Sequence, residues 1–549
     1  MPAASGIKIL KLNIVLALLI VPIFIAPWWV IYPYSIPKLI PLIGFSSASI
    51  VSIFYYFKSR TKSVTFFTGL STLLSIWLVI TLFYPHSNML QEIYGIDGRN
   101  TGFVTYFSLL VLMVGAYIIS DQEFLKVSSK VIFFVGTISA IYGILQSQGF
   151  FNILQLAQDG NISIGFLGNI NFQSSFLAIF SVLSLNQFLF NSQKIFNKLL
   201  YLSLVIMGIF AIYVTKSQQG FLVFGLGSLF LGYVYVRSFG KLTLKRFYLI
   251  FSFLSVSLIL IAIFQIGPLT NLIYEKSISI RGYYWNAGIQ MIAKNPIFGI
   301  GFDGYRDWYW RSRSKIAFQD LGKEDWAENA HNVFIDIGAS GGIPLLIIYS
   351  LLIIYTGYCG YKKIFRLKQF NYYFLGIYAA WGCYVAQSIL SINQIGIATM
   401  GWIFSGLIIG YEKIDKQSVV MKVQKEKVWD LKIWSGWLSG FLLGIYIAII
   451  PNINSSNYRQ AIELQDTQLL YRAALAKPYN SQLMVSAAEV FLVNGQEKKA
   501  KEIILIATEN FPDYYKGWET MAKFQSLPIK LKVIADSEMA RLDPLRNPG

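Results

Sequence analysis

The chain has 549 residues, of which 55% are hydrophobic and only 13% are charged, and its formal net charge is +18. Because a soluble domain carries about 25% charged residues, this composition excludes an ordinary soluble protein. Its two cysteines, Cys359 and Cys383, have neither the number nor the spacing of a disulfide framework or a zinc site. We therefore expect an all-α, polytopic helical membrane protein.

Apolar runs long enough to cross a membrane recur from one end of the chain to the other. About 20 apolar residues form a helix that spans a hydrocarbon core of about 30 Å. The first run lacks a small-x-small cleavage site and exceeds the apolar core of a signal peptide, so we expect a retained helix. We predict about 13 spans, at residues 13–32, 38–57, 64–84, 103–119, 131–147, 168–190, 199–215, 220–236, 247–266, 332–356, 371–391, 394–411 and 433–450.

Lysine and arginine gather in every second connection between these spans, from Lys58, Arg60 and Lys62 to the segment 413–432. The positive-inside rule places such connections in the cytoplasm, where their charge attracts anionic membrane lipids. The high net charge therefore does not indicate a nucleic-acid partner. The alternation places the remaining long connections outside, at residues 85–102, 148–168, 215–220 and 267–330.

The chain divides into a membrane domain, residues 1–450, and a soluble helical tail, residues 457–549. The membrane domain includes the long extracytoplasmic loop 267–330, and an odd number of spans places the tail outside as well. Met484 and Trp518 stand 34 residues apart, the period of tetratricopeptide (TPR) helix pairs. Generic helical hairpins are the alternative. In both cases we expect the tail to bind or position an acceptor or a protein partner.

His331 is one of only two histidines, and it lies where the long polar loop meets the next apolar run. A side chain that accepts a proton near neutral pH is a natural catalytic group at such a place. The structural alternative is an interfacial histidine that caps the next helix. The other histidine, His86, has no partner in the sequence, and we expect it to be structural.

Several motifs surround His331 in a fixed order. They are Arg281-x(3)-Trp285, Pro296-x-x-Gly299-x-Gly301, His331-Asn332 and the pair Gly341-Gly342. This pattern resembles the shared domain of the O-antigen ligase and O-antigen polymerase superfamily. Three further segments are similar to that family, namely Gly98-Arg99-Asn100-Thr101-Gly102, Gly168-Asn169-Ile170-Asn171 and Gln387-Ser388. The resemblance covers residues 90 to 410.

One turn departs from the family pattern. Family members often carry Ser-Arg at a short outer turn, whereas this chain has Lys216-Ser217-Gln218. If the family's arginine contacts the donor phosphate, its role here passes to Lys216 or to another residue.

A second match, Gly299-x-Gly301-x-x-Gly304, fits a dinucleotide fingerprint. Because that fingerprint has meaning only between a strand and a helix, we expect no nucleotide there.

The resemblance implies a glycan donor carried on undecaprenyl pyrophosphate and an acceptor that is a lipid, a glycan or a protein. In the same reading His331 and Arg281 are catalytic, and no cofactor or metal ion takes part. We expect the substrate to be bound by Arg99, Lys216, Asn332, Trp285 and Asn169. Arginine suits a pyrophosphate because its planar guanidinium binds phosphate oxygens bidentately, although a snorkelling arginine is the structural alternative.

Other chemistry stays open. Asp303 and Asp307 stand four apart and could form a glycosidase-like carboxylate pair or hold a divalent ion. A cluster of aromatic residues and arginines could stack on sugar, bind lipid headgroups or form an interfacial belt. This cluster comprises Arg306, Trp308, Tyr309, Trp310, Arg311 and Arg313.

We expect an inverting membrane glycosyltransferase of the bacterial cytoplasmic (inner) membrane, most like an O-antigen ligase in lipopolysaccharide biosynthesis. The alternatives of the same class are an O-antigen or polysaccharide polymerase and a protein O-oligosaccharyltransferase. A transporter or flippase of lipid-linked glycans is the rival class, which predicts ionisable residues at mid-membrane and two-fold internal symmetry. A non-catalytic scaffold protein is the third class of function.

Overall fold

The computed structural model describes residues 3–58, 65–84, 89–150, 162–191, 194–263, 276–366, 371–412 and 431–546. Within these ranges all regular secondary structure is helical, which confirms the all-α prediction. Several features named above lie outside the described residues: His86, Arg60, Lys62, the basic segment 413–430 and residues 267–275 of the long loop.

Each predicted span overlaps one long helix. These helices are α1 (Ala3–Ile20), α2 (Leu39–Lys58), α3 (Phe66–Phe83), α5 (Phe103–Ile119), α6 (Gln122–Ser147), α7 (Ile170–Phe190), α8 (Ile195–Val214), α9 (Gln218–Ser238), α10 (Leu242–Ile263), α15 (Val333–Tyr361), α16 (Tyr372–Leu390), α17 (Ile395–Glu412) and α18 (Leu431–Glu463). The first prediction, 13–32, is wrong in its second half because α1 ends at Ile20. Pro22, Pro27 and Pro33 follow, and proline lacks the N–H that a continuing helix needs. Short helices η1 (Ile36–Lys38), η2 (Gly165–Leu167) and η3 (Lys362–Arg366) flank longer ones.

Ten helices in the described part are long and apolar enough to cross a membrane, and α5 is an apolar helix just below that length. The protein is therefore a multi-pass membrane protein, while the figure of about 13 crossings stays a prediction.

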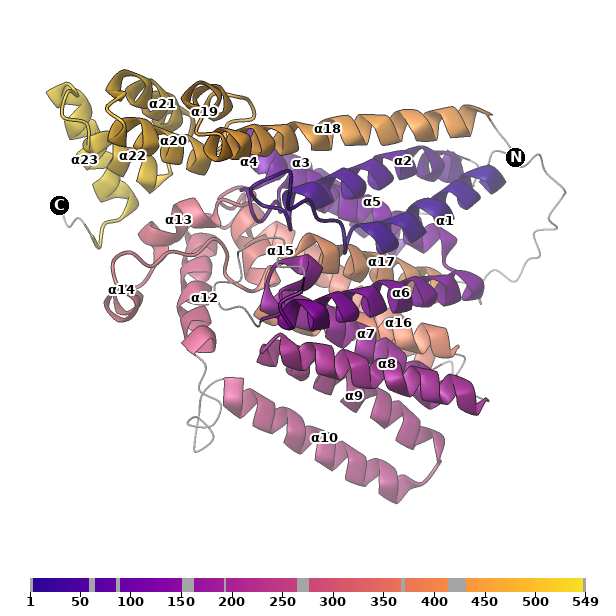
Figure 1. Ribbon diagram of the computed structural model, residues 1–549. Helices are drawn as coiled ribbons and strands as arrows, with labels where there is room; N and C mark the ends of the chain where they lie inside the picture. The colour runs from indigo at the N-terminus through magenta and orange to yellow at the C-terminus, as the bar shows by residue number, and fades with distance from the viewer. Residues whose placement is uncertain are drawn as a thin grey trace.

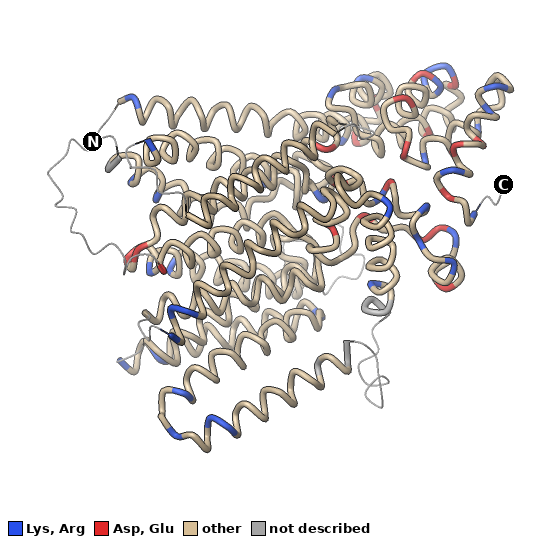
Figure 2. The backbone as a smooth tube through the Cα atoms, turned by 180° about the vertical axis from the view of Figure 1, so that it is seen from behind, with Lys and Arg blue, Asp and Glu red and all other residues tan. Residues whose placement is uncertain are grey.

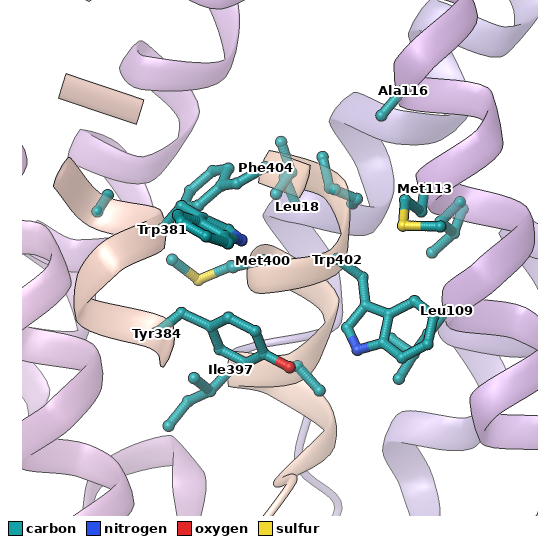
Figure 3. Close-up of a cluster of buried hydrophobic side chains, with 14 of the residues drawn as sticks. Leu18, Leu109, Met113, Ala116, Trp381, Tyr384, Ile397, Met400, Trp402 and Phe404 are labelled. Carbon is teal, nitrogen blue, oxygen red and sulfur yellow. The ribbon is translucent and has the colours of Figure 1, made fainter. Parts of the chain in front are cut away.

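The centre of the bundle is built on α17 and α7, whose residues are almost all buried. Figure 3 shows Met400, Trp402 and Phe404 of α17 among side chains from α5 and α16. Outer helices such as α10 expose large apolar side chains, among them Phe247 and Phe253. In water such a surface would be unfavourable, whereas in a bilayer it contacts lipid.

The long loop is largely helical and lies with the tail at one end of the bundle (Figure 1). It contains α12 (Lys276–Lys294), α13 (Tyr305–Ser312) and α14 (Lys315–Leu321), and the short α4 (Met89–Tyr94) lies at the same end. Figure 2 shows lysine and arginine with few acidic residues at the opposite ends of the membrane helices, whereas the loop and tail carry both basic and acidic residues.

The tail follows the membrane domain without a break, because α18 extends from the bundle to Glu463. The predicted boundary between residues 450 and 457 falls inside this helix. The tail continues with α19 (Thr467–Ala474), α20 (Ser481–Val493), α21 (Glu497–Asn510), α22 (Tyr515–Ala522) and α23 (Ile529–Leu542). Helices α20 and α21 pack together, as do α22 and α23. Their assignment to tetratricopeptide repeats stays a prediction.

Candidate functional site

Helix α12 carries Arg281, Tyr284 and Trp285 on one face, since residues three and four apart lie one above the other on a helix. The Arg-x(3)-Trp motif is thus one turn of helix rather than part of an irregular loop. Arg281 is only 8% exposed. The indole Nε1 of Trp285 is buried and has no hydrogen-bond acceptor among the described residues. A buried donor without an acceptor is costly, so a ligand oxygen is a reasonable partner for it.

His331 lies directly before α15 in the left-handed backbone region, with φ 54°. Such a conformation is uncommon for a residue other than glycine and is held here by its neighbours. Asn332 caps the helix, because its side chain accepts hydrogen bonds from the N–H groups of Phe334 (3.0 Å) and Ile335 (3.3 Å). The N–H of Ala330 donates to Asp336 Oδ1 at 2.7 Å.

The imidazole of His331 stacks on the ring of Tyr284, with ring centres 5.9 Å apart and planes 25° from parallel. The pKa of His331 is lowered from 6.5 to about 3, first by burial and in addition by the positive charges of Arg281 and Arg99. His331, Arg281 and Arg99 therefore form one electrostatic group, although the sequence separates them widely. In this group the imidazole is neutral at pH 7, and an anion bound by the two guanidinium groups would raise its pKa and make it a stronger base.

Arg99 belongs to the segment between α4 and α5, and its Nε donates to Glu328 Oε2 at 2.5 Å. Asp303 fixes this segment, because Asp303 Oδ2 accepts from the N–H groups of Ile96 and Thr101, both at 3.0 Å. The Thr101 hydroxyl donates to the other oxygen of Asp303. Burial raises the pKa of Asp303 to about 6, while the bonds from Thr101 and Ile96 and the charge of Arg99 oppose the rise.

The glycine motifs join the loop to a kink in α15. Gly341 and Gly342 leave helical geometry, and the N–H groups of Ile300 and Gly301 donate to the carbonyls of Ala339 (2.8 Å) and Ser340 (3.0 Å). A Cβ on Gly342, which has φ +75°, would collide with the carbonyl oxygen of Ile297. The backbone of the Gly-x-Gly segment therefore packs directly against the backbone of α15 and holds the loop there.

Two predicted substrate residues lie in a separate group. Asn169 caps α7 by accepting from the N–H of Asn171 at 2.8 Å. Lys216 is exposed in the turn between α8 and α9, and its neighbour Ser217 donates to Asn171 Oδ1 at 2.7 Å. Among the described contacts, neither Asn169 nor Lys216 touches His331, Arg281 or Arg99.

The arginines of α13 bind the tail. Arg306 Nη2 donates to Ser481 Oγ at 2.7 Å, and the guanidinium of Arg306 lies over the ring of Tyr514. Arg311 pairs with Asp513 at 3.0 Å and Arg313 with Asp543 at 2.7 Å. Each of these arginines thus has a partner in the tail, while the suggestion that the cluster binds sugar or lipid headgroups stays a prediction.

The two carboxylates considered as a catalytic pair also have protein partners. Asp303 holds the Arg99 segment, and Asp307 pairs with Arg306 at 2.9 Å while accepting from Gln91 Nε2 at 3.2 Å. In the described ranges, no three His, Cys, Asp or Glu side chains are arranged as metal ligands.

We predict that His331 stays unprotonated as the pH falls through 6.5. A histidine NMR titration of the His86→Gln protein in nanodiscs follows the remaining imidazole alone. We expect an apparent pKa far below 6.5, and a higher value in Arg281→Gln because one repelling charge is gone. Because the unfolded chain binds one more proton between pH 6.5 and about 3, this group lowers the free energy of unfolding as the pH falls through that window. A normal titration at pH 6.5 would contradict the burial of His331.

Sequence reasoning missed Tyr284, Glu328 and Asp336 as parts of this site. Glu328 stands in an acidic run that resembles solvated surface, yet its side chain is only 18% exposed and faces Arg99. Asp336 could have been found from the sequence, because an acidic residue four positions after Asn332 falls in the first turn of the helix that begins there. Tyr284 is marked only by its position one turn after Arg281.

Residues 202–350 match the family model described as O-antigen ligase. This range contains Arg281, Trp285, His331 and Asn332, as well as Lys216; Arg99 and Asn169 lie outside it. No curated protein matches the chain. The match supports the O-antigen ligase superfamily and, in general terms, a membrane enzyme that transfers glycan in polysaccharide biosynthesis.

Proposed function

We propose that the protein transfers a glycan from undecaprenyl pyrophosphate to an acceptor hydroxyl at the outer face of the cytoplasmic membrane. The observation that carries this proposal is the buried His331 imidazole, which stacks on Tyr284 of α12 and feels the positive charges of Arg281 and Arg99. The three residues combine a proton acceptor with two anion-binding groups. That is the set of groups that transfer from a sugar pyrophosphate requires.

The arginines would bind the pyrophosphate. Guanidinium groups hold phosphate oxygens bidentately and remain charged in a poorly solvated place. Charge builds on the pyrophosphate as the glycosidic bond breaks, so cations fixed in advance stabilise the transition state more than the ground state. Arg99 is oriented by Glu328, and Trp285 Nε1 can donate to a further oxygen of the donor.

His331 would act as the general base. As the acceptor oxygen attacks the anomeric carbon, its proton passes to the neutral imidazole, and the electrons of the breaking carbon–oxygen bond leave with the pyrophosphate. A single displacement of this kind inverts the configuration of the anomeric carbon. Tyr284, stacked on the imidazole, keeps its plane fixed during the transfer.

The proposed outer location rests on the charge distribution. Lysine and arginine cluster at the end of the bundle opposite the site, as the positive-inside rule requires of a cytoplasmic end (Figure 2). A helical tail beside the site favours a ligase that recognises a separate acceptor over a polymerase. A protein O-oligosaccharyltransferase would use the same groups.

Deleting the gene tests this function against the flippase reading. We expect finished glycan to accumulate on undecaprenyl pyrophosphate in the outer leaflet, measured by mass spectrometry of extracted lipids and by labelling of intact spheroplasts. Complementation with the wild-type chain should clear it. Accumulation in the cytoplasmic leaflet would favour a flippase instead. Unchanged amounts of lipid-linked donor and surface glycan would favour a non-catalytic scaffold.

A further inference from the structure

A cleft with a volume of about 300 Å³ opens between α13, the segment that follows α14, and the tail. Its wall includes side chains from α20, α22 and α23, so it exists only because the tail is docked on the loop. Sites between two packed parts of a protein are frequent places for small ligands. The groups named in the proposed mechanism do not line this cleft; they lie on α12, between α4 and α5, and before α15.

Four aromatic rings line the cleft, namely Trp310, Trp326, Tyr514 and Tyr515. Trp310 and Tyr515 meet edge to face, with ring centres 4.7 Å apart, and Trp310 Nε1 donates to the carbonyl of Asp325. These bonds fix the orientation of the indole. Trp326 differs, because 49% of its surface is exposed. An indole left open beside fixed aromatic rings offers a flat face to a ligand.

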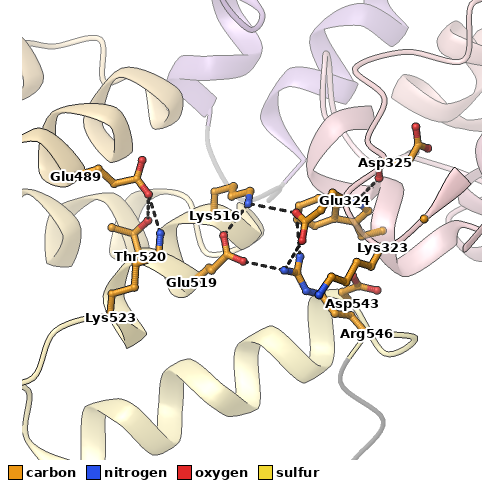
Figure 4. A network of polar contacts seen from close by, with 12 residues as sticks. Lys323, Glu324, Asp325, Glu489, Lys516, Glu519, Thr520, Lys523, Asp543 and Arg546 are labelled. Carbon is orange, nitrogen blue, oxygen red and sulfur yellow. Dashed lines mark hydrogen bonds and ion pairs between the residues drawn. The ribbon is translucent and has the colours of Figure 1, made fainter.

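Charged groups alternate with these rings. Arg306 and Asp307 form a buried ion pair at the cleft, with side chains 5% exposed. Lys516 and Glu324, which are 3.8 Å apart, lie on the more exposed side. Figure 4 shows Lys516, Glu324, Glu519 and Arg546 as one network of ion pairs that holds this side of the cleft.

This combination fits a carbohydrate better than an apolar ligand. A sugar ring has an apolar C–H face that stacks on an aromatic ring and hydroxyls at its edge that bond charged side chains. A purely apolar ligand would bury the charged groups beside it without giving them partners, which is costly. A strongly anionic or cationic ligand would meet both signs of charge in the same cleft.

We propose that this cleft binds a segment of the donor glycan, an inference that rests on the proposed function. If Arg281 and Arg99 hold the pyrophosphate and the lipid lies in the bilayer, the glycan must extend toward the aqueous end, where α13 and the tail lie (Figure 1). A contact chain joins the two places: Asp307 in the cleft accepts from Gln91 of α4, and α4 leads directly to the segment of Arg99.

The test uses the full-length protein in nanodiscs and polysaccharide released from the source strain by mild acid, cut to oligosaccharides and titrated by calorimetry. We expect saturable binding by the wild type, affinity at least about tenfold weaker in Trp326→Ala, and partial recovery in Trp326→Phe, which keeps a ring. Trp28→Ala is the matched control, because Trp28 is also an exposed tryptophan, with 73% of its surface exposed, and lies outside the cleft.

The outcomes separate the two proposals. His331→Ala should bind the oligosaccharide as the wild type does, since His331 does not line the cleft. No saturable binding by the wild type, or equal affinity in Trp326→Ala, would overturn the cleft proposal whatever the transfer assay gives. Normal binding together with normal transfer by His331→Ala would overturn the proposed catalytic role and leave the cleft in place.

Discussion

Replacing His331 with alanine should lower the rate of glycan transfer by about 10²- to 10⁴-fold, the range that a general base contributes. The reason is that His331 is the one histidine among the described residues, and its neutral imidazole is the proton acceptor of the proposed mechanism. The arginines remain, so the donor should still bind. The measurement is transfer by purified protein from extracted lipid-linked donor at saturating concentration, with surface glycan and retained donor followed in complemented cells.

Two variants make the result specific. His86→Ala removes the other histidine and should transfer normally, and both variants must reach the wild-type level in the membrane. His331→Gln keeps a polar side chain of similar reach but cannot act as a base, so it should fail as His331→Ala does. If either His331 variant restores normal glycan, the residue has only a structural role before α15 and the mechanism is wrong.

Breaking the Arg313–Asp543 pair should release the tail from the membrane domain. The two side chains are 1% and 0% exposed and 2.7 Å apart, and Arg313 also donates to the carbonyls of Gly322 and Lys323. Removing one partner of a buried ion pair leaves the other charge without compensation and costs about 3–5 kcal/mol. Arg313→Ala should therefore destabilise the docked tail by about this amount.

Limited proteolysis and hydrogen exchange of α22 and α23 measure this undocking. Replacing both partners, as in Arg313→Met with Asp543→Leu, should cost less than either single change, because no unpaired charge remains. Arg541→Ala is the control on the same tail, since its side chain is 44% exposed and both of its ion-pair partners, Asp513 and Glu538, belong to the tail itself. Equal protection of Arg313→Ala and wild type would show that the pair does not hold the tail.

A docked tail also matters for the cleft, because Tyr514, Tyr515 and Lys516 reach it only from α22. Arg313→Ala should consequently weaken oligosaccharide binding even though Arg313 does not line the cleft. This links the buried ion pair to substrate recognition through the position of one helix.

The sequence alone determined the membrane character, the helical class and the order of the long helices. Apolar runs of about 20 residues are local properties that need no partner in order to be recognised, and proline alone explains why α1 ends early. His331 and Arg281 were also identified locally, from rare residue types in motifs that resemble a known family. The same resemblance added Asn169 and Lys216, which the fold brings near each other around Asn171, and their role in substrate binding stays a prediction.

Tertiary structure decided what these residues contact. Arg99 and Glu328 are far apart in the chain, as are Arg313 and Asp543, and no periodicity in the sequence indicates which acid pairs with which arginine. The depressed pKa of His331 likewise depends on burial and on two cations brought in by other segments. Local sequence fixes helices because their hydrogen bonds are local, whereas electrostatic and packing partners are fixed only when distant segments meet.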